Sequence, residues 1–286
     1  MVQGAGDRMN IDIRGKIMNR FWIAVVFAVL TPIMALAADE PQEEDLNTQM
    51  MRATVKISDD KSSGTGFILT KGKKYLLVTA AHVFDKTPGD EMTVVFRSKQ
   101  AEGEYTQEPT KLAIRKDGKP LWTKHPTEDV AVIWVVPPKN ADLPQLTTEL
   151  LATDDQLRKN KVHPGDKLAY LGYPAEVAVG KAGFPLLRDG PIASFPLLPT
   201  AKTKAFMMST NAFEGDSGGP VYLVRPSHTN PDKVVRLIVG LVSEHQFLYE
   251  EDMRLGPPER TRKTQRLELA IVVHASFIKE AVDLLK

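Results

Sequence analysis

The stretch Phe213-Glu214-Gly215-Asp216-Ser217-Gly218-Gly219-Pro220-Val221 places one serine among three glycines, ahead of a proline and an apolar run. Glycines at this density allow a sharp turn and a close approach to the backbone, because no Cβ atom is in the way. Such a turn also aligns successive backbone N–H groups, which suits a developing oxyanion. The serine is either a nucleophile or part of an ordinary tight loop, and the choice depends on whether the chain also supplies a base and a carboxylate.

The candidate base is a histidine at the end of an apolar strand. His82 closes the run Leu76-Leu77-Val78-Thr79-Ala80-Ala81, where the chain turns and would hold the side chain rigidly. A structural histidine would fit the same place. The other histidines are weaker candidates: His245 is ambiguous, and a surface position is expected for His125, His163, His228 and His274, which lie in polar or terminal contexts.

The candidate carboxylate is Asp129, which directly precedes the apolar run Val130-Ala131-Val132-Ile133-Trp134. An acid at the edge of a buried strand is costly unless it is hydrogen-bonded. The N–H of a histidine would be a suitable donor and would fix the tautomer of the imidazole. The alternative for Asp129 is a strand-end cap or a solvated turn residue.

Short apolar strands separated by turn signals favour a β-sandwich or β-barrel over a βαβ arrangement. A connector at about 138–166, with a helical turn or two expected at 146–161, separates two strand sets, and a charged loop is expected at 250–265. Apolar residues at helical spacing predict a closing helix at 276–285 with Ser276 as its N-cap. The expected strands are Ala53–Ile57, Gly64–Leu69, Tyr75–Ala80, Met92–Arg97, Lys111–Ile114 and Val130–Val136, then Lys167–Leu171, Pro191–Phe195, Ala205–Met208, Val221–Val224, Val234–Ser243 and Leu267–Val273.

Composition excludes several classes of function. The chain has 286 residues, 42% of them apolar, which suffices for one large all-β domain or two small ones. The absence of cysteine excludes disulfides, thiolate catalysis and cysteine-bound zinc. A net charge of +1 gives no electrostatic basis for nucleic-acid binding. No metal-binding cluster or cofactor is expected from the sequence, although a bound calcium ion is left open.

The N-terminal residues indicate export. Arg14, Lys16 and Arg20 precede an apolar run that ends in Ala35-Leu36-Ala37, the three-part pattern of a secretory signal peptide at 1–37. Residues 38–50 are acidic and lack apolar periodicity, so they are expected to form a disordered leader. The protein would then be secreted or periplasmic, without membrane contact after signal cleavage. An uncleaved signal that anchors the protein in the membrane is the alternative.

Three short motifs together resemble the signatures of the trypsin-like (chymotrypsin-fold) serine proteases. They are Thr79-Ala80-Ala81-His82, Asp129-Val130-Ala131-Val132 and Gly215-Asp216-Ser217-Gly218-Gly219-Pro220. Their order is His, Asp, Ser, with intervals of 47 and 88 residues. The resemblance covers residues 51 to 285. Within the family, the chain resembles an HtrA-like bacterial branch, although no PDZ module is expected after the protease domain.

The resemblance implies an all-β fold of two antiparallel β-barrels with the active site in the cleft between them, closed by a C-terminal α-helix. The protease domain would cover 51–286, with the N-terminal barrel at about 51–137, the connector at 138–166, the C-terminal barrel at 167–275 and the helix at 276–285. It also implies that Ser217 attacks the scissile carbonyl, that His82 takes and returns the proton, and that Asp129 orients His82. The N–H groups of Gly215 and Ser217 would form the oxyanion hole.

Substrate-binding residues follow from the same resemblance. Asn211, six residues before the nucleophile, would lie at the base of the S1 pocket. Cleavage after arginine or lysine would need an acid at this position, so an asparagine does not support that specificity. Ser243 matches the serine of the strand that pairs with the substrate backbone. Glu244 and His245 depart from the aromatic residue and glycine that are common there, so His245 would narrow or polarise the pocket. A preference for small or medium uncharged P1 residues is expected.

Asp216 raises the question of activation. In many family members this aspartate pairs with a new N-terminal ammonium group after cleavage of a propeptide, but no Ile-Val-Gly-Gly type start is present. The hypothesis is that another group, or solvent, satisfies Asp216. The leading interpretation is an exported serine endopeptidase acting on proteins or peptides, with no prediction of its oligomeric state. A protease-fold binding or scaffold protein with little turnover, and an esterase, are the alternatives.

Overall fold

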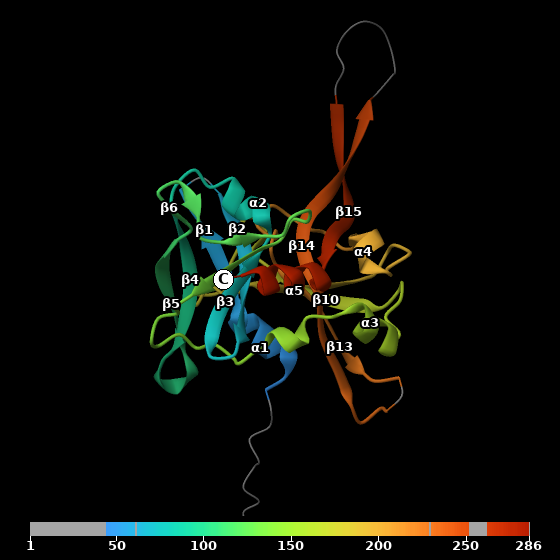
Figure 1. Cartoon of the computed structure of the whole chain (residues 1–286), viewed down its shortest axis with the longest axis horizontal. Helices are drawn as coiled ribbons and strands as arrows, with labels where there is room; N and C mark the ends of the chain where they lie inside the picture. The colour runs from blue at the N-terminus through green and yellow to red at the C-terminus, as the bar shows by residue number, and fades with distance from the viewer. Residues whose placement is uncertain (1–43, 61, 229, 252–261, 286) are drawn as a thin grey trace, which may run out of the picture. The chain divides into compact units, whose positions relative to one another are not determined.

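The computed structural model describes residues 44–60, 62–228, 230–251 and 262–285. The proposed signal peptide and the first residues of the expected leader therefore lie outside the described residues, as does 252–261. Two antiparallel sheets dominate the described part of the chain (Figure 1). The all-β prediction is confirmed.

The first sheet has seven strands in the order β5-β4-β1-β2-β3-β9-β8. A two-stranded ribbon of β6 (Arg115–Lys116) and β7 (Lys119–Pro120) lies between β5 and β8 in the chain. The central strands β2 and β3 are buried on nearly every residue, as their apolar runs predict. The strands of the sheet are β1 (Thr54–Ser58), β2 (Ser63–Lys71), β3 (Lys74–Thr79), β4 (Glu91–Lys99), β5 (Tyr105–Ala113), β8 (Thr123–Lys124) and β9 (Ala131–Val135).

The second sheet has six strands in the order β11-β10-β13-β14-β15-β12. An isolated bridge between Ile192 and Met208 links its two ends, so this sheet closes on itself. β14 and β15 continue as a long hairpin beyond the other strands (Figure 1), which shortens the expected charged loop. The strands are β10 (Lys167–Gly172), β11 (Leu186–Pro191), β12 (Ala205–Ser209), β13 (Pro220–Pro226), β14 (Val234–Glu251) and β15 (Arg262–His274).

One expected strand is misplaced. The sequence predicts a strand at Pro191–Phe195, but β11 ends at Pro191. After it, Ile192 forms an isolated bridge with Met208, Ala193 N donates to Met207 O, and Ser194 Oγ accepts from Met207 N. The actual strand, Leu186–Pro191, contains Arg188, Asp189 and Gly190, whose types do not favour a strand.

The prediction of disorder is wrong for the end of the leader. Helix α1 spans Leu46–Ala53, and the carboxylate of Asp45 caps it by accepting from the N–H groups of Asn47 and Thr48. Leu46, Met50 and Ala53 are buried, which is a helical spacing. Three apolar positions in an acidic stretch give a weak periodic signal, and it is their burial against the sheet that stabilises the helix.

The remaining helices are short. The connector contains the 3₁₀ turn Thr148–Leu150 and α3 (Asp154–Lys159), in which Thr153 and Gln156 form a capping box, so the expected helical turns are present. The others are α2 (Ala81–Asp85), α4 (Thr200–Thr203), and the 3₁₀ turns Ala101–Gly103 and Pro174–Glu176.

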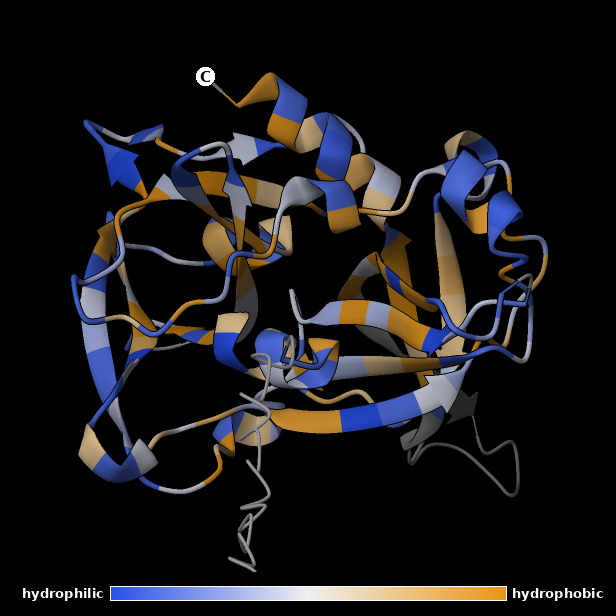
Figure 2. Cartoon of the chain, turned by 90° about the horizontal axis from the view of Figure 1, so that it is seen from below, coloured by the Kyte–Doolittle hydropathy of each residue, from blue (hydrophilic) through white to orange (hydrophobic). Residues whose placement is uncertain are grey.

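The C-terminal helix is confirmed, but its start differs. α5 spans Ala275–Leu284 with His274 at the N-cap position, and the hydroxyl of Ser276 instead contacts Thr200 Oγ1 at 3.1 Å. α5 contacts β8 and β9 of the first sheet and β14 and β15 of the second. Figure 2 shows the alternation of apolar and polar residues along α5.

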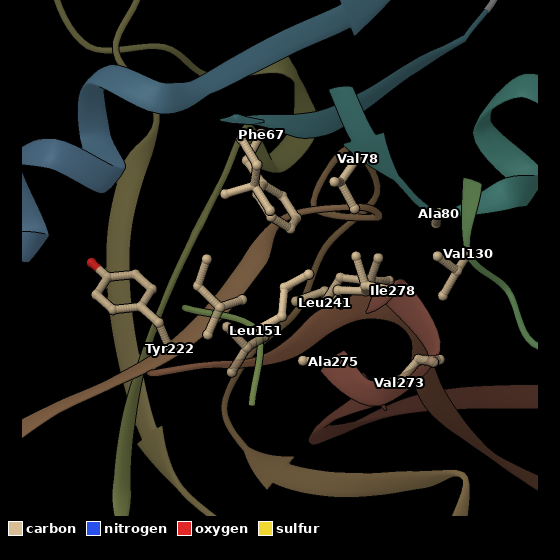
Figure 3. Close-up of a cluster of buried hydrophobic side chains, with 14 of the residues drawn as sticks. Phe67, Val78, Ala80, Val130, Leu151, Tyr222, Leu241, Val273, Ala275 and Ile278 are labelled. Atoms are coloured by element: carbon tan, nitrogen blue, oxygen red, sulfur yellow. The ribbon is translucent and has the colours of Figure 1, made fainter. Parts of the chain in front are cut away.

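The core is shared between the two sheets and α5. Figure 3 shows Phe67, Val78 and Val130 from the first sheet region facing Leu241 from the second and Ile278 from α5, and all five are buried. The segments that follow β3, precede β9 and precede β13 are thereby held at the junction of the sheets. These three segments carry His82, Asp129 and Ser217.

Candidate active site

His82 lies in the first turn of α2, directly after β3 ends at Thr79. Its ring Nδ1 lies 2.7 Å from Asp129 Oδ2, and its backbone N–H donates to Asp129 Oδ1 at 2.9 Å. Two contacts to one carboxylate fix both the backbone and the ring of the histidine. With Nδ1 protonated toward Asp129, Nε2 is left as the basic nitrogen.

Asp129 precedes β9 and accepts a third hydrogen bond, from Ser243 Oγ at 2.6 Å. Burial alone would raise the pKa of Asp129. The hydrogen bond and charge of His82, together with the Ser243 hydroxyl, outweigh burial and lower the pKa to about 2. The carboxylate is therefore ionised over the range in which a peptidase works.

Ser217 lies in the glycine-rich turn before β13. Its carbonyl oxygen accepts from Thr65 N at 2.9 Å, and the next amide, of Gly218, donates to Val242 O at 2.7 Å. The hydroxyl of Ser217 donates to the backbone carbonyl of Ser243 at 3.0 Å. Among the described residues, no hydrogen bond joins Ser217 Oγ to His82. The serine hydroxyl thus has an acceptor other than the candidate base.

The backbone around Ser217 presents two amides to the site. The carbonyl oxygen of Glu214 accepts from Ala175 N at 2.7 Å, and in a trans peptide the N–H of Gly215 then points the opposite way. Gly215 has φ of +91°, and a Cβ atom there would lie 2.3 Å from Tyr173 O, so only glycine fits. Within the described part of the chain, the amides of Gly215 and Ser217 donate to no protein acceptor.

Asp216 is fully buried, and its partner is an arginine that the sequence did not indicate. The carboxylate forms an ion pair with Arg188 of β11 and accepts from Phe213 N at 2.7 Å. A single arginine in a stretch with little strand character gives no sequence signal for this role. Only the register of β10 and β11, which places Arg188 opposite Tyr170, brings it to the serine turn.

The expected substrate-binding residues have different outcomes. Asn211 lines a cavity of about 560 Å³ together with Arg188, Phe213 and Glu268. Ser243 lies at the site with its hydroxyl on Asp129 and its carbonyl on Ser217. His245 belongs to β14, opposite Ala270 of β15, and its side chain lies outside the described residues. The role of each in substrate binding stays a prediction.

Two of the four histidines expected at the surface are buried. His125 contacts Glu280 at 3.1 Å and the ring of Phe277, and His274 packs against Phe206. Both lie where strands meet the C-terminal helix, a packing that polar flanking residues do not reveal. In the described ranges no group of three or more histidines or acids could hold a metal ion. No helix among the described residues is long and apolar enough to span a membrane.

The fold and the site together define a chymotrypsin-type architecture. The family model of the trypsin-like peptidase domain matches residues 64–225. The chain belongs to the trypsin-like peptidase domain family, and the expected trypsin-like serine protease assignment is confirmed. It is therefore a serine-type endopeptidase by family.

The fold is similar to that of several solved structures. An inactive form of Rv3671c from M. tuberculosis H37Rv is 17% identical with a TM-score of 0.45, over 84% of this chain and 89% of that one. The serine endoprotease from Yersinia pestis is 16% identical with a TM-score of 0.45, over 85% of this chain and 67% of that one. An HtrA-type protease with a tripeptide is 16% identical with a TM-score of 0.46, over 84% of this chain and 62% of that one. No curated protein matches the chain.

Proposed function

We propose that the chain is an exported serine endopeptidase that hydrolyses peptide bonds through Ser217, His82 and Asp129 and an acyl-enzyme intermediate. Membership of the family makes proteins or peptides the substrate class. The observation that carries the proposal is the pair of contacts between His82 and Asp129, at 2.7 and 2.9 Å, together with Ser243, which is hydrogen-bonded to both Asp129 and Ser217.

In the first half-reaction the hydroxyl of Ser217 turns from the Ser243 carbonyl toward His82 Nε2. A new bond forms between Ser217 Oγ and the scissile carbonyl carbon as the hydroxyl proton passes to Nε2. The amides of Gly215 and Ser217 stabilise the resulting oxyanion. The carbon–nitrogen bond then breaks, the amine leaves with the proton from Nε2, and the acyl group remains on Ser217.

In the second half-reaction a water molecule replaces the leaving amine. His82 Nε2 takes a proton from the water, whose oxygen attacks the acyl carbon, and the bond to Ser217 Oγ breaks with return of the proton. Asp129 stays ionised throughout and stabilises the imidazolium ion. Its low pKa, about 2, supports this role because the carboxylate stays charged when His82 is protonated.

Substrate selection is proposed at Asn211, Ser243 and His245. The Ser243 segment of β14 would pair with the substrate backbone, and Asn211 would face the P1 side chain from the cavity of about 560 Å³. Asn211 carries no charge, so we expect small or medium uncharged P1 residues. Cleavage of a peptide library gives the profile directly, and a profile dominated by arginine or lysine would refute this assignment.

A binding or scaffold protein with little turnover is the second candidate. One observation favours it: the Ser217 hydroxyl donates to a backbone carbonyl rather than to His82. Reaction with a fluorophosphonate probe separates the two, because labelling of Ser217 needs a working base and oxyanion hole. We expect labelling of the wild-type protein, none of Ser217→Ala, and a kcat about 10⁴-fold lower in that variant. A folded wild-type protein that is neither labelled nor active on peptides would refute the peptidase function and support the binding or scaffold function.

An esterase on the same residues is tested by the ratio of peptide to ester turnover. Export is tested separately, by mass spectrometry of the N-terminus of protein from the native host. Cleavage after Ala37 supports a secreted or periplasmic protein, and an intact N-terminus in the membrane fraction supports an anchored one.

A further inference from the structure

Asp216 lies between Gly215 and Ser217, whose amides are proposed for the oxyanion hole, and its carboxylate forms an ion pair with Arg188. Its side chain is 0% exposed, and Arg188 is 21% exposed. A buried carboxylate is costly unless a cation or hydrogen-bond donors compensate it. Arg188 supplies the positive charge, and the Phe213 amide supplies the second donor at 2.7 Å.

Arg188 is held in place by contacts that do not involve Asp216. Its guanidinium lies 4.5 Å from the centre of the Tyr170 ring, which is its cross-strand neighbour. Arg188 Nη1 also donates to the carbonyl oxygen of Asn211 at 3.1 Å. The same carbonyl accepts from the Tyr170 hydroxyl at 2.9 Å. The cation is therefore fixed by strands β10 and β11, which are rigid elements of the second sheet.

The position of Asp216 determines where the two amides point. The turn is packed tightly on that side, because a Cβ atom on Gly172 would lie 2.3 Å from Asp216 Oδ1 and one on Gly219 would lie 2.1 Å from Leu171 O. On the other side, Thr65 Oγ1 donates to Gly215 O at 2.6 Å. Movement of the Asp216 side chain out of its place would rotate the peptide groups on both sides of it.

Among the described residues, Arg188 supplies a positive charge that balances the carboxylate of Asp216. The described residues directly before β1 form α1, whose side chains Leu46 and Met50 are buried. The cation comes from the middle of the chain, 28 residues before Asp216. The cavity lined by Arg188 and Asn211 reaches this ion pair from solvent.

We propose that Arg188 is a positioning residue which holds the turn from Glu214 to Ser217 in its catalytically competent form, so that turnover requires no newly formed amino terminus. The inference rests on the proposed peptidase function. It identifies the group that satisfies Asp216 and makes the enzyme active as soon as it is folded.

The test compares kcat, KM and fluorophosphonate labelling in Arg188→Met, Arg188→Lys and Arg188→Ala. We expect kcat of Arg188→Met to fall about 100-fold or more, as on loss of an oxyanion donor, with KM little changed. Arg188→Lys should recover part of the rate. Guanidinium ion, which can enter through the cavity, should raise the rate of Arg188→Ala and leave the wild-type rate unchanged. A residue that served only stability would show neither the rescue nor a selective loss of kcat.

Arg158→Met is the matched control, since Arg158 of α3 pairs with Asp154 and Asp155 and does not line this cavity. Its kcat should match the wild type. If Arg188→Met does not fold, the test is the kcat of wild-type protein whose amino terminus is acetylated or extended. This protein should keep full activity. Loss of activity on blocking the terminus, or a wild-type kcat in folded Arg188→Met, overturns the inference. A wild-type enzyme that is not labelled at all overturns instead the proposed function.

Discussion

Ser243 donates its hydroxyl to Asp129 Oδ2 at 2.6 Å while its own carbonyl oxygen accepts the hydroxyl of Ser217 at 3.0 Å. One residue of β14 thus touches both ends of the candidate triad. Its side chain completes the set of donors around the carboxylate, and its backbone holds the serine hydroxyl away from the base. The strand proposed to bind the substrate backbone is therefore connected directly to the candidate catalytic groups.

Replacement of Ser243 by alanine should remove the side-chain contact and keep the carbonyl. A hydrogen bond to a charged group is worth about 1.5–3 kcal/mol, so we expect kcat/KM to fall by about tenfold or more. The pKa of Asp129 should rise, because one of the groups that lower it is lost. Ser276→Ala, whose hydroxyl contacts Thr200, is the control. Equal kcat/KM in Ser243→Ala and wild type would contradict the role of this hydroxyl.

Asp129→Asn should impair catalysis more strongly. The carboxylate accepts from the His82 ring, the His82 amide and the Ser243 hydroxyl, and an asparagine must present an NH₂ group to some of these donors. The imidazole would then change tautomer or orientation, and we expect kcat to fall by about 10³–10⁴. Steady-state kinetics at saturating peptide measures this. A fall in KM alone, with kcat preserved, would show that Asp129 does not orient the base.

Acid stability should depend on His274. This histidine is buried, and burial lowers its pKa from 6.5 to about 4 in spite of the charge of Asp154. The unfolded chain binds this proton more readily, so the free energy of unfolding should decrease as the pH falls from about 6.5 to about 4, and then level off. The loss attributable to His274 is about 3 kcal/mol at most.

The measurement is urea denaturation of wild type and His274→Phe between pH 4 and 7. The variant should lose less stability over this range, because the phenylalanine ring that replaces His274 cannot be protonated. His163→Gln, at an exposed histidine, is the control and should follow the wild type. Identical pH dependence of His274→Phe and wild type would refute the assignment.

The sequence indicates the strands and the candidate catalytic residues because both have local signals. His82 and Asp129 lie at the ends of apolar runs, and Ser217 lies among glycines, so each could be found without knowledge of the fold. The contact between His82 and Asp129 follows from the pairing of β3 with β9, two strands recognisable by their apolar residues.

The sequence does not predict that Arg188 pairs with Asp216 or that Ser243 contacts both Asp129 and Ser217. Both arrangements depend on the register in which the strands pair. Arg188 reaches Asp216 only because β10 and β11 pair with Tyr170 opposite Arg188. A shift of one residue would place Leu187 or Asp189 there and turn the cation to the other face. Helix α1 was missed for a related reason, because its stability comes from contacts with the sheet and with one distant arginine.

That arginine is Arg97 of β4, which is 2% exposed and ties α1 to the rest of the domain. Its guanidinium donates to the carbonyl oxygens of Met51 at 3.2 Å and Arg52 at 3.0 Å, in the last turn of α1, and to that of Thr54. Such carbonyls have no partner within a helix and carry partial negative charge. The same guanidinium donates to the Tyr173 hydroxyl at 3.0 Å. Tyr173 directly precedes the 3₁₀ turn Pro174–Glu176, whose Ala175 N donates to Glu214 O.

Arg97→Met should therefore destabilise the protein and release α1. Each buried carbonyl left without a donor costs about 1–3 kcal/mol, so we expect the free energy of unfolding to fall by about 3 kcal/mol or more. Hydrogen exchange should accelerate at residues 46–53 beyond the change elsewhere. Arg225→Met, which removes an arginine bonded to Asn160 O at 2.7 Å, should lower stability without this local effect. Unchanged exchange in α1 of folded Arg97→Met would show that the helix is held by its apolar side chains alone.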